Sequence, residues 1–439
     1  MPYHREKPLF SQSSNHKFSA DLRVMSQILD EHPVFTQWVH EDLTAGICKK
    51  GSGAKGMTSE QVLRAGLIKQ MNDWSYEFLE IQCIDSEMTR AFIKLGFDES
   101  YSDSCLQSNI SRVRGGTWQK ISDGLVRYGA VMGLEKGRVI RMDSTVIESN
   151  IHEPSDSSLM YDMIRTVNQV FGKMRKELGI RVYGNISTKD AKKFVLRIMN
   201  AISPEERKKH YKKLLKSCKE MLDRIKKARL KLDDDCGAAK KLDNILELAP
   251  RIIDQTYRRV IKEEKVPSTE KIVSVFESHT DIIVKGKRKV EYGHKVFFTS
   301  GASGLVLDCQ IARGNPSDSE FFMPLIEKQK ELYGRAPRQT TADGGFASTD
   351  NVLDAKTAGV SDVCFSKRCH LQIEEMVKSK WVFEKLRNFR AGIESLISCL
   401  KRAFSLDQVN WKGQDGYAAY VHSAVAAYNL HRLSRILQN

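Results

Sequence analysis

The chain has 439 residues, which is long enough for two or three domains and a sizeable core. Its 41% hydrophobic and 28% charged residues are typical of a globular protein, and they exclude a fibrous or low-complexity chain. The 70 Lys and Arg residues exceed the 55 Asp and Glu residues, and the net charge of +15 favours a polyanionic partner, first of all nucleic acid.

The nine cysteines are scattered and form no CxxC pair. This pattern argues against a disulfide framework or a structural zinc site and favours a reducing cytosol. Cys364, Cys369 and His370 could form a metal cluster, but no fourth ligand accompanies them, so buried thiols are the preferred interpretation. We find no signal peptide and no long apolar run, and we therefore expect no membrane insertion.

Residues 1–20 are polar and irregular and predict a flexible tail. Residues 21–136 predict a helical domain for DNA binding or dimerisation. Asp21 is the expected cap of a helix over 22–31, and Thr58 with Gln61 forms a capping box for a helix over 59–71. Further helices are expected at 76–84, 88–95, 105–113 and 117–131.

Within this domain, residues 106–114 present side chains that can read base edges and phosphates, among them Arg112 and Arg114. A DNA recognition helix and a plain bundle helix are about equally favoured, because no single sequence signature marks this kind of reader.

Residues 137–150 predict the first strand of a sheet, bounded by a glycine turn. Alternation along the strand puts Arg141 and Asp143 on one face. Aspartate is disfavoured in such a run, which makes Asp143 a candidate functional residue. The alternative is a structural acid that pairs with Arg141.

Residues 151–290 lack strand patterns and predict a mostly helical, basic insertion, with helices over 161–178, 188–202, 204–233 and 242–263. Residues 201–231 carry 12 Lys and Arg against 4 Asp and Glu. We expect a phosphate-contacting arm, and a solvated coiled-coil face is the alternative.

Residues 291–439 return to strands, at 291–299, 305–312, 337–342 and 363–366, with helices at 318–333, 348–358, 388–406 and 416–437. The order of these elements predicts an α/β protein whose mixed sheet is flanked by helices.

The helix over 388–406 has an apolar stripe and, on another face, Arg390, Glu394 and Lys401. Taken alone, these charges could be a solvated helix face. Trp381, which precedes this helix, could stack on a flipped base, but we expect it to pack in the core.

Asp143, Asp343 and Glu394 are the carboxylates that this element order singles out: one on a strand, one at a strand end and one on a covering helix. Three such acids would repel one another unless cations lay between them, and Mg²⁺ or Mn²⁺, as two ions, suits oxygen ligands. Arg390 and Lys401 would hold a phosphate. Each acid alone could be structural, and Asp343 with Gly344 could be only a turn.

The constellation resembles the DDE transposases of bacterial insertion sequences, which have an RNase H-like catalytic core. The family signature Tyr-x2-Arg-x3-Glu-x6-Lys matches at Arg390, Glu394 and Lys401, and Arg387 stands at the tyrosine position. The segments that also resemble the family are 58–71, 101–114, 291–299, 312–319 and 341–348. An insertion after the first strand sets this chain apart from many relatives.

The resemblance implies a transposase that binds the terminal inverted repeats of its element as double-stranded DNA. With Mg²⁺ it would hydrolyse one strand at each end and join the 3′-hydroxyl to target DNA. It also implies a homodimer or higher assembly and a cytoplasmic, nucleoid-associated bacterial protein. The alternatives are an RNase H-like nuclease that does not join strands and a catalytically inactive, transposase-derived DNA-binding protein. The metal chemistry needs no histidine, so we expect His294 to line the sheet.

Overall fold

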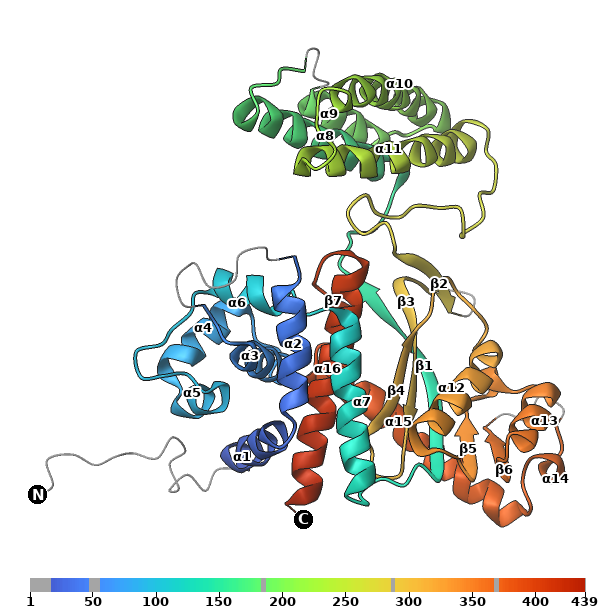
Figure 1. The fold of residues 1–439 in the computed structure, drawn as a ribbon. Coiled ribbons are helices and arrows are strands. Elements are labelled where there is room, and N and C mark those ends of the chain that lie inside the picture. The colour runs from blue at the N-terminus through green and yellow to red at the C-terminus, as the bar shows by residue number, and fades with distance from the viewer. Residues whose placement is uncertain (1–16, 47–55, 183–186, 286–288, 367–370, 439) are drawn as a thin grey trace, which may run out of the picture. The chain divides into compact units, whose positions relative to one another are not determined.

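The computed structural model describes residues 17–46, 56–182, 187–285, 289–366 and 371–438. The chain divides into two compact units. One unit consists of Met1–Glu148 and His294–Asn439, and the other of Ser149–Gly293. Figure 1 shows the elements of both units in chain order from blue to red.

The first unit begins with a bundle of helices. The last helix of the chain, α16 (Gly413–Leu437), runs beside α7 and also contacts α1 and α3, so the bundle and the C-terminus share one core (Figure 1). The bundle helices are α1 (Lys17–Asp30), α2 (Pro33–Thr44), α3 (Ser59–Met71), α4 (Tyr76–Asp85), α5 (Glu87–Ile93), α6 (Asp103–Ile110) and α7 (Gly115–Val131).

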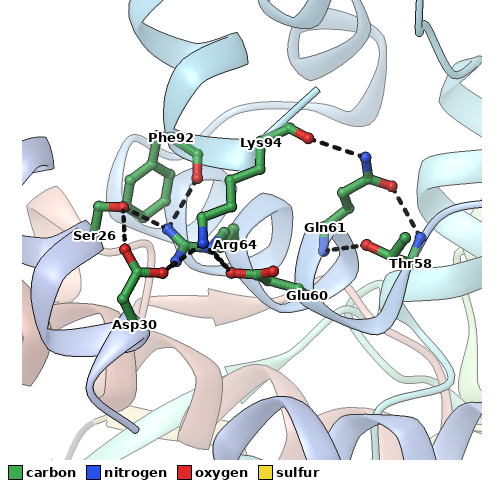
Figure 2. A network of polar contacts seen from close by, with 8 residues as sticks. All are labelled: Ser26, Asp30, Thr58, Glu60, Gln61, Arg64, Phe92 and Lys94. Atoms are coloured by element: carbon green, nitrogen blue, oxygen red, sulfur yellow. Dashed lines mark hydrogen bonds and ion pairs between the residues drawn. The ribbon is translucent and has the colours of Figure 1, made fainter. Parts of the chain in front are cut away.

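A buried arginine ties three of these helices together (Figure 2). The Arg64 guanidinium has no exposed surface and pairs with Asp30 at 2.7 Å and with Glu60 at 3.0 Å. It also donates to a serine hydroxyl and a backbone carbonyl, so its donors are largely satisfied. Lys94 pairs with the same two acids at 2.5 and 2.7 Å. Because both acids are partly exposed, this network holds the helices in place without burying an unpaired charge.

The sheet of the first unit is mixed. Along it, β3, β1, β5 and β6 are neighbours in that order, while β4 pairs with β3 and β7 pairs with β1. β1 and β5 are parallel, as are β5 and β6, whereas β3 and β4 form an antiparallel hairpin. The strands are β1 (Val139–Ser149), β3 (Lys289–Ser300), β4 (Val306–Ile311), β5 (Gln339–Ala342), β6 (Asp362–Phe365) and β7 (Gln408–Val409).

Helices pack on this sheet and confirm the expected mixed α/β class. The long helix α15 (Lys380–Ala403) lies against β5 and β6, while α12 (Asp318–Tyr333) contacts β4 and α13 (Thr349–Thr357) contacts β6. A short helix, α14 (Ile373–Met376), precedes α15. The expected apolar stripe of α15 is buried at Ile393, Leu396, Leu400 and at Phe404 just beyond it.

The second unit is helical apart from the strand β2 (Asp281–Lys285), which pairs with the first part of β3. It has its own apolar core, to which all four of its long helices contribute. These are α8 (Asp156–Glu177), α9 (Thr188–Met199), α10 (Pro204–Arg229) and α11 (Gly237–Thr256), and α11 continues into the π-helix η1 (Tyr257–Ile261).

Local signals predicted several elements correctly and failed at others. The capping box of Thr58 and Gln61 is confirmed. Asp21 does not cap a helix, because α1 already begins at Lys17 and the buried Asp21 carboxylate pairs with Arg435 at 2.6 Å. The expected helix over 105–113 ends at Ile110. The elements α2, β2, β7 and α14 had no prediction.

The remaining expectations concern membrane insertion and residues that the structure does not describe. In the part of the chain that the structure describes, no helix combines the length and the apolar character needed to cross a bilayer. Most of the expected tail, residues 1–16, and the possible ligands Cys369 and His370 are outside the described residues. Cys364 is a buried thiol, as expected.

Candidate active site

Asp143 and Asp343 stand side by side because two parallel strands pair in register. β1 and β5 pair from Val139 with Gln339 through Met142 with Ala342. The next residue on each strand is an aspartate. Paired strands lie about 4.8 Å apart, so the two aspartates are neighbours, with Asp143 inside β1 and Asp343 just after the end of β5. The strand pairing therefore brings together two acids that are 200 residues apart in the sequence.

Asp343 lies where β5 stops. A 3₁₀ turn over Gly344–Phe346 follows it immediately. The hydroxyl of Ser366, the first residue after β6, donates to Asp343 Oδ1 at 2.5 Å, and its backbone N–H donates to the Ala342 carbonyl at 3.1 Å. The two strand ends therefore hold this carboxylate at the carboxyl edge of the parallel strands, where sites of α/β proteins gather.

The surroundings of Asp143 oppose its ionisation. Burial raises the pKa of Asp143 to about 6, and the charges of Asp343 and Asp318 also raise it. The N–H of Ser144, at 2.8 Å, and the charge of Arg390 act in the opposite direction. Burial and neighbouring carboxylates together make this an acid that a cation would stabilise.

Arg390 links the first acid to the third. Its Nη1 lies 3.5 Å from Asp143 Oδ2, and its Nη2 lies 2.5 Å from Glu394 Oε1. The Arg390 side chain is only 15% exposed, whereas that of Glu394 is 60% exposed. Glu394 thus faces the other acids across a guanidinium and has room to move away from it.

A second arginine fixes α15 against β1. Arg141 Nη1 donates to the Phe389 carbonyl at 3.1 Å, and its guanidinium lies 4.7 Å from the centre of the Phe389 ring. A Cβ at Gly392 would lie 1.8 Å from Arg141 Nη1, so only glycine leaves room for this arginine. Arg141 and Asp143 both reach α15, as their shared strand face predicts, and Asp143 pairs with Arg390 instead of with Arg141.

Lys401 lines a cavity together with Asp143 and Glu394. Its Nζ donates to the Val146 carbonyl at 2.9 Å and pairs with Asp407 at 3.3 Å. The cavity encloses about 510 Å³. Its lining includes Asp143, Thr145, Glu394, Ser398, Lys401 and Arg402. The structure thus places Asp143, Glu394 and Lys401 around one opening on the surface of the first unit.

The donor set suits a hard divalent cation in part. Asp143 and Asp343 offer oxygen ligands at neighbouring positions of β1 and β5, and burial, which raises the pKa of Asp143, disfavours the charged form of that acid. Among the described residues, no three acidic, histidine or cysteine side chains converge as a ready metal site, and Glu394 is bound to Arg390 instead. The two aspartates fit a cation as they stand, and Glu394 fits one once Arg390 releases it.

Asp318 is a polar neighbour of the site that the sequence did not single out. It is the first residue of α12, accepts a hydrogen bond from Ser144 Oγ at 2.9 Å and pairs with Lys295 at 2.7 Å. An acid in the first turn of a helix is explained locally by the helix dipole, so its sequence context gave no reason to suspect a second role.

Arg112 and Arg114 make their contacts in the helical bundle. Arg112 donates to the Leu43 carbonyl at 2.9 Å, and Arg114 pairs with Asp42 at 2.5 Å. Both lie beyond the end of α6, so the helix that was predicted over 105–113 does not extend to them. Their role as DNA contacts stays a prediction, and the Arg114 side chain is 61% exposed.

Trp381 corrects another expectation. It lies in the first turn of α15 and is 68% exposed, so it does not pack in the core. The buried stripe of this helix begins at Val382 and Phe383, next to Trp381 but on the other side. Lys385 Nζ lies 5.2 Å from the centre of the Trp381 ring. His294, in contrast, is buried in β3 against the Tyr417 ring, as expected.

Comparison with known families supports the same assignment. Residues 252–430 match the model of the transposase DDE domain, and this segment contains Asp343, Glu394 and Lys401. The match supports a DDE transposase, and the mixed sheet with flanking helices is consistent with the RNase H-like fold of such transposases. Asp143 precedes the matched segment and joins it through the pairing of β1 with β5. No curated protein and no solved structure matches the chain.

Replacing Asp143 should stabilise the metal-free protein at neutral pH. The pKa of Asp143 is about 6 in the folded chain and near 4 in the unfolded chain. Its charge therefore opposes folding above pH 6, and this cost disappears as the pH falls toward 4. At about 1.4 kcal/mol per pKa unit, Asp143→Asn should raise the free energy of unfolding by about 3 kcal/mol at pH 8 and by almost nothing at pH 4.

The measurement is urea unfolding with a chelator present, at both pH values. Asp350→Asn, at an exposed acid in the first turn of α13, is the control and should change little. Loss of stability in Asp143→Asn at pH 8 would show that Asp143 is a structural acid.

Proposed function

We propose that this chain is the transposase of a bacterial insertion sequence. It binds the terminal inverted repeats of its element, hydrolyses one strand at each end and joins the 3′-hydroxyl to target DNA. The observation that carries the proposal is the register of β1 and β5, which sets Asp143 beside Asp343 opposite Arg390 and Glu394. The family match supports a polynucleotidyl transfer as the chemistry.

Asp143, Asp343 and Glu394 would hold the divalent metal, Mg²⁺ or Mn²⁺, as two ions. Such ions activate a water or hydroxyl nucleophile and stabilise the leaving oxygen of a phosphodiester. The exposed Glu394 would exchange its bond to Arg390 for this site. The freed Arg390 would then present its guanidinium to a phosphate, a group that it can bind with two parallel hydrogen bonds.

Lys401 would position the DNA. Its Nζ is tethered to the Val146 carbonyl, on the strand that carries Asp143, and a quarter of the side chain is exposed to the cavity. A tethered ammonium loses little conformational freedom when it binds a phosphate. The exposed Trp381 lies on the same helix and supports a stacking contact with a base, in place of the core role expected from its sequence.

Helix α10 of the second unit supports a further contact with the DNA backbone. Lys212, Lys216 and Lys219 are exposed, and their spacing puts them on one face of this helix. With Tyr257 of the π-helix they line a groove of about 560 Å³, to which Glu220 and Asp223 also contribute. Lysines beside an exposed aromatic ring suit a sugar-phosphate backbone.

The remaining parts of the proposal follow from the chemistry of transposition. Two ends of one element must be cut and joined together, which calls for a homodimer or a higher assembly on double-stranded DNA. The DNA of a bacterium lies in its cytoplasm, so the protein would act at the nucleoid. An RNase H-like nuclease that cuts without joining is the alternative, and it differs only in the joining step.

Cleavage should require all three acids. In Mg²⁺, Asp143→Asn, Asp343→Asn and Glu394→Gln should each lower the rate of nicking at terminal-repeat DNA on the order of a hundredfold or more, because each removes a ligand of the metal ions that stabilise the reacting phosphate. Glu384→Gln, at an exposed glutamate on the same helix, is the matched control. Full cleavage by any of the three variants would remove that acid from the proposed site.

A second substrate separates the transposase from the nuclease. DNA with a pre-cleaved end and a free 3′-hydroxyl should be joined to a target plasmid by the wild-type chain. Efficient nicking without any joined product would favour the nuclease.

Replacing the lysines of α10 should reduce the salt dependence of DNA binding. Each phosphate contact contributes ~0.9 to the slope of log K against log salt. The triple variant Lys212→Gln, Lys216→Gln and Lys219→Gln should therefore lower that slope by roughly one to three. The matched control replaces the exposed Lys120, Lys136 and Lys330 of the first unit. Equal slopes for the two triple variants would reject the assignment of α10.

A further inference from the structure

The carboxylate of Asp318 contacts the residues that follow the two candidate metal ligands, Asp143 and Asp343. Asp318 Oδ1 accepts a hydrogen bond from Ser144 Oγ at 2.9 Å, and Ser144 directly follows Asp143. On the other side, a Cβ at Gly345 would lie 2.5 Å from Asp318 Oδ2. Gly345 comes two residues after Asp343. The absence of a side chain at Gly345 thus lets Asp318 lie between the two acid-bearing segments.

Asp318 is itself held in place by a cation. Lys295 Nζ pairs with Asp318 Oδ1 at 2.7 Å, and its side chain is only 13% exposed. The same Nζ donates to the Pro316 carbonyl at 3.0 Å and lies 5.5 Å from the centre of the Phe297 ring. This lysine, on β3, therefore fixes the Asp318 carboxylate on the side of the sheet where β1 and β5 present their acids.

Capping of α12 does not require the inward orientation of Asp318. The start of this helix is closed by Ser317 and Glu320, whose Oε1 accepts from Ser317 Oγ at 2.7 Å and from the Ser317 N–H at 3.3 Å. A first-turn acid that served only the helix dipole could remain in solvent. Asp318 instead accepts a hydrogen bond from Ser144 and pairs with Lys295.

We propose that Asp318 is a positioning residue that sets the spacing between Asp143 and Asp343 for divalent metal binding. It acts through Ser144 on the first acid and through its contact with Gly345 on the second, and Lys295 keeps it in place. This inference rests on the proposed function, because it assigns Asp318 a role in the same metal site.

The test is Mn²⁺ binding to the full chain without DNA, followed by electron paramagnetic resonance. Removing a residue that orients metal ligands typically weakens metal affinity by roughly 10- to 100-fold. Asp318→Ala should therefore raise the dissociation constant at least about tenfold. Ser144→Ala should raise it by less, because it leaves the contact with Gly345 intact.

The Mn²⁺ affinity of the double variant Asp318→Ala with Ser144→Ala distinguishes a positioning role from a merely structural one. If Asp318 acts on Asp143 through Ser144, adding Ser144→Ala to Asp318→Ala should weaken Mn²⁺ binding no further. Independent, multiplying effects of the two substitutions, or wild-type affinity in Asp318→Ala, would overturn the proposal. Asp350→Ala, at a first-turn acid of α13, is the matched control and should bind Mn²⁺ as the wild type does.

Two further measurements keep the result interpretable. Thermal unfolding checks each variant, and Asp318→Asn, which keeps the side-chain volume, takes the place of Asp318→Ala if the alanine variant is unfolded. Asp318→Asn should also weaken Mn²⁺ binding, since it loses the charge that pairs with Lys295, and wild-type affinity there would equally overturn the proposal. If the wild type neither binds Mn²⁺ nor cuts DNA, the proposed function itself fails. If the wild type binds Mn²⁺ and cuts DNA, and Asp318→Asn binds Mn²⁺ with the same affinity, only the proposed role of Asp318 fails.

Discussion

The parallel pairing of β1 with β5 is the constraint on which the rest of the site depends. Hydrogen bonds along four residue pairs bring the two strands into register, and the fifth position on each is an aspartate. The chain therefore uses backbone bonding to hold two carboxylates together against their repulsion. Burial, to which the charges of Asp343 and Asp318 add, raises the pKa of Asp143 to about 6. Such an arrangement opposes folding, and a cation would relieve it.

Two arginines, Arg141 on β1 and Arg390 on α15, lie beside this concentration of negative charge. Arg141 anchors the helix through the Phe389 carbonyl and ring, and Gly392 leaves the space that this contact needs. Arg390, one turn along from Glu394, then lies between that glutamate and Asp143. The same guanidinium that neutralises the metal-free site is the group proposed to bind phosphate. Exchange of Glu394 from Arg390 to the metal would thus couple metal binding to the exposure of a phosphate donor.

The sequence predicted what depends on local pattern. The capping box at Thr58, the apolar stripe of α15 and the order of strands and helices all follow from spacing along the chain. Asp143 was found because aspartate is disfavoured inside a strand, and Asp343 because it ends one. Glu394 was found because it occupies its position in the family signature. The match of residues 252–430 to the transposase DDE domain supports the predicted family, and the roles of the individual acids stay predictions.

What the sequence could not show depends on contacts between distant segments. No local pattern states that Asp143 lies beside Asp343, because strand register is decided by the whole sheet. Asp318 escaped notice because a helix-start acid already has a local explanation. Trp381 was expected in the core on the basis of its apolar surface alone, yet α15 begins at Lys380, which turns the ring away from the buried stripe. Asp21 failed as a cap for a similar reason, since its partner Arg435 is more than 400 residues away.

The most direct test of the central claim is anomalous X-ray scattering from crystals of the protein soaked in Mn²⁺. The account predicts a metal peak bonded to carboxylate oxygens of both Asp143 and Asp343, at about 2.1 Å, the distance of octahedral oxygen ligands. A protein that cuts DNA in Mn²⁺, but whose crystals show the metal bound elsewhere, would contradict it.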